Sequence, residues 1–433
     1  MNQLQIFLPC AAGAEEYLGT EVAQITARPT LDIQRWRGGV LLQGSWRDAM
    51  QLNLHSRIAQ RVLVQLFHGD YRSEQDLYRA ASEVAWEIWF TPRQSIKVEV
   101  TAQHSPLSSL NFAALKIKDA VCDRFRAKSG GVRPDVDTHW PDIRIYAHLT
   151  TDTVSLYVDT SGEALFKRGW REDKGEAPLK ETLAATLIAA SGWTGAAEQP
   201  LYDPCCGSGT IAIEAAQIAL RIAPGSLRHF AFEKMLPFQA HVWQAIKTDA
   251  ARAQCPPGAL DKPFIFGSDV AHRMVDFAQR NAQRAGVAGA IEFRGGDALQ
   301  RLPPSELAGL MIVNPPYGER IAAAGLAGSG FARQRRAVVS QGDPAQVAAV
   351  AGRELAQTED GGEFFAQLAA HWKRHYPGWT AWVLTPDLKL PGRMRLKESR
   401  RVPMWNGPIE CRLFRFDMVR GSARATPGAA AAP

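Results

Sequence analysis

Apolar and polar residues alternate along the first 165 positions in a pattern that predicts short strands with amphipathic helices between them. Strands are expected over 5–10, 95–103 and, as two strands around a turn, 143–162. Helices are expected over 14–25, over the first half of 46–67 (which continues as a strand) and over 111–130. Gly38 and Gly39 separate two apolar runs and predict a hairpin. This half of the chain is therefore expected to be α+β.

From Ala177 onwards, apolar runs of strand length alternate with helical stretches. The strands are expected within 200–203, 263–270, 291–298, 309–318 and 379–386, and the helices over 179–193, 210–220, 271–286 and 363–375. Strands that alternate with helices predict a parallel sheet with crossover helices, which is an α/β fold. Two final runs, 399–405 and 409–419, flank an Asn-Gly-Pro turn and predict an antiparallel hairpin at the edge of that sheet.

Two stretches lack this regularity. The tail 421–433 is dominated by small residues and is expected to be disordered. Residues 322–362 are rich in Ala, Gly, Gln and Ser and predict a flexible insertion, within which Asp343 and Pro344 are suited to begin a helix. This insertion is either a spacer or a lid that contacts RNA through a basic cluster, which consists of Arg333, Arg335 and Arg336.

The composition of the 433 residues, 46% hydrophobic and 22% charged, is that of a globular protein, and the length suggests about three domains. Charges, Pro and Gly interrupt every long apolar run, so no membrane span is expected. The N-terminus lacks the pattern of a signal peptide. Six cysteines without a C-x-x-C pair predict neither disulfides nor a metal site, and Cys205 and Cys206 are expected to be packing residues. A cytoplasmic monomer without a metal is therefore expected.

The formal net charge is +6 and the pI is about 9.0, which is compatible with a polyanionic partner. Besides the cluster in the insertion, basic residues gather in two segments, 167–174 and 393–401. Each cluster alone is equally compatible with an ordinary solvent-exposed surface. Brought together by the fold, the three would form a binding surface for phosphates.

Chemistry is indicated first by a glycine loop between a strand and a helix, Asp203-Pro-Cys-Cys-Gly-Ser-Gly-Thr210. Glycines at 207 and 209 let the backbone approach a ligand closely, and the following helix offers unpaired N–H groups to an anion. The loop also fits the dinucleotide pattern G-x-G-x-x-A, so a nicotinamide or flavin enzyme has to be considered. That pattern requires an acid about 20 residues further on, where this chain has His229 and Phe230 and no strand.

Acids instead follow the next two predicted strands, Asp269 after one and Asp297 after the other. Asp269 is placed to hold a ribose diol and Asp297 to accept from an adenine amino group. Asp203 would repel phosphates but would pair with an ammonium group. A ligand with an adenosine, a carboxylate and an ammonium is S-adenosylmethionine, which is therefore the predicted cofactor. Taken singly, Asp269 and Asp297 would read as turn or cap residues.

A rigid turn, Asn314-Pro-Pro-Tyr317, follows the fourth predicted strand. The side-chain oxygen of Asn314 and the carbonyl of Pro315 can each accept one hydrogen of an exocyclic amine. Holding both hydrogens orients the nitrogen and offsets the positive charge that develops on it during methylation. Tyr317 can stack on a base that has been flipped out of a helix. The turn therefore predicts a methyltransferase that acts on an amine.

The Gly loop together with 314–320 resembles the class I methyltransferases of exocyclic amines. Residues 166–193 resemble the linker and first helix of THUMP-domain RNA methyltransferases, and the stretches 111–125 and 133–169 resemble the THUMP module. Within that family the chain is most similar, over nearly its whole length, to bacterial 23S rRNA guanine-N2 methyltransferases. The resemblance implies methyl transfer to the N2 amine of a guanine in large-subunit rRNA.

The resemblance also implies a domain order and a set of site residues. A ferredoxin-like region is expected over 1–50, a THUMP domain that binds RNA over 51–162, and a Rossmann-like, seven-stranded methyltransferase domain over 163–420. The residues expected to hold the cofactor are Asp203, Cys206, Gly207, Gly209, Asp269, Asp297 and Asn314. The residues expected to hold the guanine and catalyse transfer are Asn314, Pro315 and Tyr317. Some members of the family carry a second methyltransferase domain, and a second modification is expected to belong to another protein.

Three alternatives remain open at this point. An amine methyltransferase of another RNA, such as tRNA, or of DNA adenine would use the same turn. A nicotinamide enzyme would explain the Gly loop but would leave the turn without a role. An RNA-binding protein without catalysis would explain the basic clusters but not the predicted cofactor site.

Overall fold

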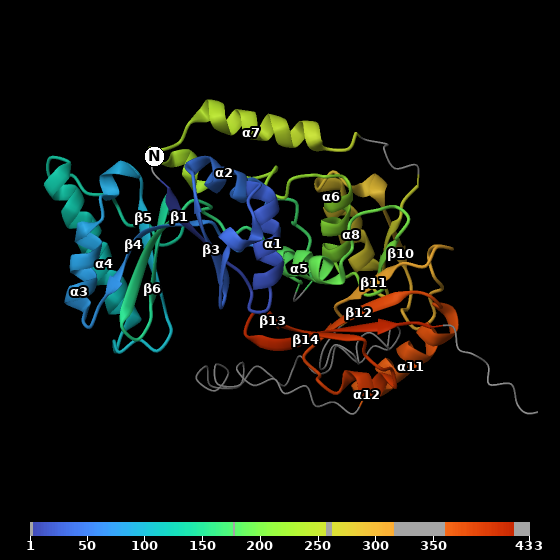
Figure 1. The fold of residues 1–433 in the computed structure, drawn as a ribbon. Coiled ribbons are helices and arrows are strands. Elements are labelled where there is room, and N and C mark those ends of the chain that lie inside the picture. The colour runs from blue at the N-terminus through green and yellow to red at the C-terminus, as the bar shows by residue number, and fades with distance from the viewer. Residues whose placement is uncertain (1–2, 176–177, 257–261, 316–359, 420–433) are drawn as a thin grey trace, which may run out of the picture. The chain divides into compact units, whose positions relative to one another are not determined.

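A computed structural model describes residues 3–175, 178–256, 262–315 and 360–419 (Figure 1). The chain folds into two compact units, each assembled from segments that are separate in the sequence. The first unit contains Met1–Glu172, Leu179–Ala190 and Gln217–Ala259. The second unit contains Asp173–Pro178, Ser191–Ala216 and Leu260–Pro433. The predicted insertion falls almost entirely, and the predicted tail entirely, outside the described residues.

The first unit is built on a sheet with the strand order β2-β3-β1-β4-β7-β6-β5. The strands are β1 (Leu4–Pro9), β2 (Gln34–Trp36), β3 (Gly39–Gly44), β4 (Leu63–Asp70), β5 (Ile96–Ala102), β6 (Ile143–Leu149) and β7 (Thr153–Asp159). β5 and β6 are parallel, and the other neighbours are antiparallel. The predicted hairpin is confirmed, because Trp36 pairs with Gly39 across a two-residue turn. Elements from both predicted N-terminal regions share this one sheet.

Helices and sheet of the first unit enclose one continuous hydrophobic core. The helices are α1 (Glu15–Thr26), α2 (Trp46–His55), α3 (Glu74–Glu83), α4 (Leu110–Lys128), most of α5 (Glu181–Ser191) and α7 (Ala240–Ala253), with 3-10 turns at Thr30–Asp32, Trp86–Ile88 and Ala231–Lys234. Every second residue of β6, beginning with Ile143, is buried in this core. In Figure 1, α3 and α4 lie together on one side of the sheet and α7 runs along α2, with which it is in contact.

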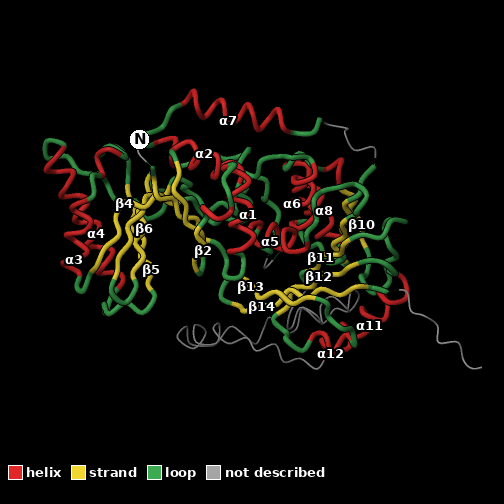
Figure 2. The backbone as a smooth tube through the Cα atoms, in the orientation of Figure 1, coloured by secondary structure: helices red, strands yellow, loops and turns green. Residues whose placement is uncertain are grey.

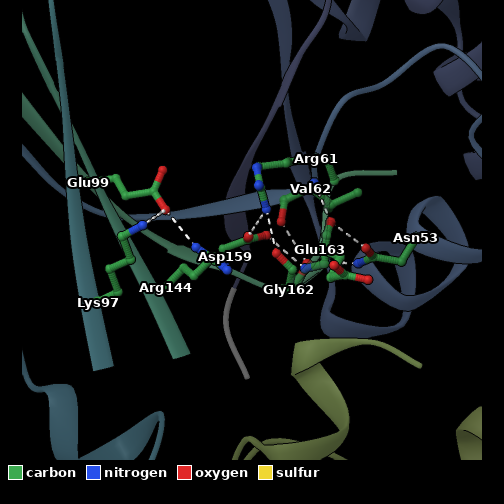
Figure 3. Close-up of polar contacts among 12 residues, drawn as sticks. Asn53, Arg61, Val62, Lys97, Glu99, Arg144, Asp159, Gly162 and Glu163 are labelled. Carbon is green, nitrogen blue, oxygen red and sulfur yellow. Dashed lines mark hydrogen bonds and ion pairs between the residues drawn. The ribbon is translucent and has the colours of Figure 1, made fainter. Parts of the chain in front are cut away.

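A buried polar network fixes the end of β7 in the first unit (Figure 3). Arg61 donates to the Asp159 carboxylate and to the carbonyl of Gly162, both at 2.6 Å. The side chain of Asp159 is completely buried, and that of Arg61 is 18% exposed. On the neighbouring strands, Lys97 and Arg144 both reach the carboxylate of Glu99, at 3.4 and 2.7 Å. The charges of this region therefore compensate one another.

The second unit contains the predicted parallel sheet, with the order β10-β9-β8-β11-β12-β14-β13 (Figure 2). The strands are β8 (Leu201–Asp203), β9 (Ile265–Asp269), β10 (Ile291–Gly295), β11 (Leu310–Val313), β12 (Thr380–Thr385), β13 (Arg400–Asn406) and β14 (Ile409–Asp417). The first five are parallel to one another. The predicted hairpin at the edge is confirmed, because β14 pairs antiparallel with both β12 and β13.

The crossover helices of the second unit are the first turns of α6 (Thr210–Ala219), then α8 (His272–Arg284), α11 (Asp360–His375) and α12 (Leu390–Met394), with a 3-10 turn at Ala288–Ala290. α11 and α12 pack with β12 and β14 around a second core that includes Trp372, Phe414 and Phe416. β8 lies in the middle of the sheet, with β9 and β11 as its two neighbours. In open α/β sheets, ligands bind beyond the carboxyl ends of strands at such a reversal of strand order.

Candidate active site

The polar residues predicted from the sequence meet at one edge of the second sheet. The register pairs Asp203 at the end of β8 with Gly267, which lies two residues before the end of β9 at Asp269. Asp297 follows the end of β10 by two residues, and Asn314 follows β11 directly. Because these four strands are parallel neighbours, all of their carboxyl ends lie at the same edge.

The Gly loop joins β8 to α6, and its two glycines have different surroundings. Both have positive φ angles, +52° at Gly207 and +87° at Gly209. A Cβ atom at Gly207 would meet nothing within 4 Å, whereas one at Gly209 would lie 2.9 Å from the Cβ of Ala278. Gly209 therefore lets the loop pack against α8, and Gly207 leaves open space beside the backbone. That space is what a closely bound ligand requires.

Asp203 is a buried acid without a neutralising cation among the described residues. Its side chain accepts one hydrogen bond, from the backbone N–H of Cys205 at 3.1 Å. No basic side chain in the described part of the chain pairs with it. Burial raises its pKa to about 8, and the nearby Asp269 acts in the same direction. An ammonium group of a ligand would supply the missing positive charge.

The other two acids are held by backbone N–H groups and keep further acceptor capacity. Asp269 accepts from Gly207 at 3.0 Å with one oxygen and from Ala271 at 2.9 Å with the other. Burial raises the pKa of Asp269. Asp297 accepts from Leu299 at 2.9 Å and is half-buried. Each carboxylate oxygen can accept a second hydrogen bond, so hydroxyl and amino donors of a ligand fit these positions.

The two cysteines of the loop are packed rather than reactive. Cys206 is buried, and its backbone N–H donates to the carbonyl of Ser268 at 2.9 Å. Burial raises the pKa of both thiols well above the ordinary value, with Asp203 and Asp269 adding to the effect. Any contact of Cys206 with a ligand would therefore use groups other than its N–H or a thiolate.

The Asn-Pro-Pro-Tyr turn, 314–317, is described in part. Asn314 is half-buried and Pro315 is buried at the end of β11. Tyr317 lies outside the described residues. β11 is the direct neighbour of β8, so Asn314 and Asp203 end adjacent strands. The structure thus brings Asn314, Pro315 and the three acids to one edge.

The structure describes two of the three basic clusters, 167–174 and 393–401. In 167–174, Arg168 is buried and donates to the carbonyls of Leu165 and Arg57, while Arg171 pairs with Glu181 at 2.7 Å. In 393–401, Arg393 pairs with Asp387, which follows the carboxyl end of β12 by two residues, and Lys373 of α11 donates to the carbonyl of Arg395. The cluster 333–336 lies outside the described residues.

The sequence interpretation missed several polar residues beneath the site. Ser268, directly before Asp269, shares a hydrogen bond of 2.6 Å with Tyr202. Tyr376 and His371 both bond to the carbonyl of Arg301. A serine inside the apolar run of β9 was a local signal for the first contact. Nothing near Tyr376 in the sequence indicates the second.

Among the described residues, no group of three or more His, Cys, Asp or Glu side chains is arranged to hold a metal ion. No helix in the described ranges combines the length and apolarity that crossing a membrane requires.

Three family sequence models match this chain in succession. A ferredoxin-like domain of the RlmL type matches residues 5–63, a THUMP domain matches 71–159, and an RMKL-like methyltransferase domain matches 168–329. The matched methyltransferase segment contains the Gly loop, the three acids and Asn314.

Curated relatives share the whole length of this chain. A ribosomal RNA large subunit methyltransferase K/L of Psychromonas ingrahamii is 36% identical over 98% of the chain and 52% of the relative. The protein of the same name in Shewanella loihica is 35% identical over 97% of the chain and 54% of the relative. The chain thus spans about half the length of the curated relatives it matches.

Solved structures share the fold. A methyltransferase-like protein complexed with S-adenosylhomocysteine (SAH) superimposes with a TM-score of 0.78 at 24% identity, over 98% of this chain and 100% of the other. A predicted N6-adenine-specific DNA methylase from Listeria monocytogenes gives 0.76 at 27% identity, over 96% of each chain. The predicted fold, a seven-stranded class I methyltransferase domain preceded by an α+β region, is confirmed.

Proposed function

We propose that this chain, which carries a THUMP domain and an RMKL-like methyltransferase domain, methylates the exocyclic N2 amine of a guanine in large-subunit rRNA. The observation that carries the proposal is the meeting of Asp203, the Gly loop and Asn314 at adjacent strand ends. The names of the curated relatives support an rRNA substrate. An rRNA substrate implies a cytoplasmic protein.

S-adenosylmethionine, when bound, supplies the methyl group on a sulfonium centre. The buried carboxylate of Asp203 would hold the ammonium of the amino-acid part, and the open space beside Gly207 would admit the ligand close to the backbone. Asp269 would hold the ribose hydroxyls, and Asp297 would accept from the adenine amine. Cys206 would line the loop as a packed, neutral side chain.

Asn314 and Pro315 would orient the guanine. Their oxygens would each accept one hydrogen of the N2 amine, which directs the nitrogen lone pair out of the ring plane and towards the methyl group. As positive charge develops on nitrogen, both acceptors become more favourable, so they stabilise the transition state more than the ground state. Tyr317 would stack on the extruded base.

The nearest rival is methylation of an adenine amine in DNA. The likeness to a structure named as an adenine DNA methylase favours it, since the same acceptor pair would serve N6 of adenine. The THUMP match over 71–159 favours RNA.

The deciding experiment is methyl transfer from labelled S-adenosylmethionine to total RNA and to genomic DNA, both from a strain that lacks the protein, followed by nucleoside analysis. Label in N2-methylguanosine of large-subunit rRNA is the expected result. Label in N6-methyladenosine or in N6-methyldeoxyadenosine would overturn the base assignment. Label confined to tRNA would overturn the choice of RNA.

A further inference from the structure

We infer that two buried tyrosines, Tyr202 and Tyr376, act as a brace that positions the three acids of the candidate active site, which are Asp203, Asp269 and Asp297. This positioning sets the affinity of the site for the cofactor. Neither residue would touch the ligand, so both are positioning residues. The inference rests on the proposed function, because it assumes that the three acids bind S-adenosylmethionine.

The centre of the brace is a stacked pair of rings. The ring centroids of Tyr202 and Tyr376 lie 6.4 Å apart, and the ring planes differ by 5°. Tyr202 is 2% exposed and Tyr376 is 1% exposed. Tyr202 belongs to β8, whereas Tyr376 directly follows α11. The pair therefore joins the central strand of the sheet to the helix layer.

The hydroxyl of Tyr202 reaches the end of β9. Its oxygen lies 2.6 Å from the Oγ of Ser268. Ser268 precedes Asp269, and its carbonyl accepts from the N–H of Cys206 at 2.9 Å. Tyr202 itself precedes Asp203. A single side-chain contact thus links the backbone of two acids and of the Gly loop.

The hydroxyl of Tyr376 reaches the β10 loop. It donates to the carbonyl of Arg301 at 2.9 Å, and a ring nitrogen of His371 lies 2.7 Å from the same oxygen. The N–H of Arg301 donates back to the carbonyl of Asp297 at 3.0 Å. The turn that carries the third acid is therefore tied to the same pair of rings.

Packing alone does not explain these hydroxyl groups. A phenylalanine at either position would fill nearly the same volume and bury no polar group. The two hydroxyls instead contact Ser268 and the carbonyl of Arg301, close to the acids that are proposed to bind the ligand. A binding site has to be held within about 0.5 Å of its productive geometry by contacts of this kind.

The test uses Tyr202→Phe and Tyr376→Phe, which keep the stacked rings and remove one hydroxyl each. Tyr71→Phe is the matched control, because Tyr71 is also 2% exposed and bonds to Ser105 and Thr150 at 2.8 and 2.7 Å, but belongs to the first unit. All three variants should lose similar thermal stability. Only the two brace variants should bind SAH more weakly, by about two- to tenfold in Kd by calorimetry, the effect of one lost hydrogen bond.

Amide hydrogen exchange of the ligand-free protein supplies a readout that does not depend on the ligand. Tyr202→Phe should speed exchange in the Gly loop, where the N–H of Cys206 bonds to Ser268. Tyr376→Phe should speed exchange over 299–301, and Tyr71→Phe should change neither segment. Exchange that matches the wild type in both loops would overturn the brace.

Steady-state kinetics separate positioning from catalysis. We expect a higher KM for S-adenosylmethionine with kcat and the KM for RNA nearly unchanged. Loss of thermal stability without a change in SAH affinity would reduce the pair to a structural role and overturn the inference. A wild-type protein that binds no SAH would instead overturn the proposed function, while the exchange experiment would still decide whether the brace exists.

Discussion

Two buried aspartates, one in each unit, are treated in opposite ways by the protein. Asp159 in the first unit is completely buried and pairs with Arg61 at 2.6 Å. Asp203 in the second unit is 2% exposed and receives a single backbone hydrogen bond from Cys205. Burial raises the pKa of both carboxyl groups. At Asp159, the guanidinium of Arg61 and two backbone N–H groups act in the opposite direction and lower the pKa.

This difference distinguishes a buried acid with a structural role from one that is suited to bind a ligand. A buried charge that the chain compensates has its partner within the fold and needs no ligand, so its site is complete. A buried charge that the chain leaves without a cation costs stability, which is tolerated where a ligand provides the cation. This contrast can be tested from both sides.

The largest expected effect comes from removing the cation of the complete pair. Arg61→Met leaves Asp159 buried without its partner and should lower the free energy of unfolding by about 3–5 kcal/mol. Denaturant unfolding measures the loss. SAH affinity should stay at the wild-type value, because the pair belongs to the first unit. A stable Arg61→Met protein would break the comparison, since Asp159 would then not need its cation.

The second largest effect is expected on the methyl-transfer rate, when the proposed hydrogen-bond acceptor Asn314 is removed. Asn314→Ala should lower the methyl-transfer rate by at least about 10²-fold, the usual scale for one oriented polar group in a transition state. Single-turnover transfer to RNA measures it. Thermal stability and SAH binding should change little, and near-normal turnover would contradict the role given to Asn314.

A smaller effect is expected at the uncompensated acid. Asp203→Asn keeps the shape but removes the charge that would pair with the ligand ammonium, so SAH should bind about 10- to 100-fold more weakly, the scale of a hydrogen bond to a charged group. Calorimetry measures the change. The ligand-free variant should be at least as stable as the wild type at pH 8, because a buried charge has been removed. Equal SAH affinity in both proteins would exclude Asp203 as the ammonium partner.

The same acid also predicts a pH dependence of stability and of SAH binding. The pKa of Asp203 is raised from 3.8 to about 8, so the folded protein holds this proton more tightly than the unfolded chain does. The stability of the ligand-free protein should therefore fall as pH rises from about 4 to 8. In the proposed role, the ligand ammonium pairs with the ionised carboxylate, so the SAH affinity should rise between pH 6 and 8, by up to about tenfold per pH unit. Asp203→Asn should abolish this rise, and a flat wild-type profile would contradict the assignment.

Local sequence patterns were sufficient to predict where the strands of the second unit end and where the Gly loop lies. The acids stand within two residues of apolar runs, and parallel strands necessarily bring their ends together. Among the described helices, α3, α7 and the short α12 escaped the periodicity argument, although Ser73 and Asp76 form a capping box at the start of α3. The capping box is a sequence signature that could have been read.

Contacts between distant residues left no such signature. Arg61 pairs with Asp159, and Tyr376 stacks on Tyr202, although the partners in each pair are far apart in the sequence. The partners of the basic residues could not be predicted for the same reason: Arg168 donates to two carbonyls and Arg171 pairs with Glu181, whereas the sequence shows only their charge. The joining of two predicted N-terminal regions into one sheet also depends on a pairing, β1 with β4, that no local motif encodes.

The interleaving of the two units has a consequence for synthesis on the ribosome. Phe230, Phe232 and Trp243 belong to the core of the first unit, yet they follow the Gly loop in the chain. The nascent first unit therefore waits for about 90 further residues after Glu172, roughly 4 to 17 s at bacterial translation rates. During that interval its core remains open to chaperones, and slow codons between 172 and 259 would prolong the exposure.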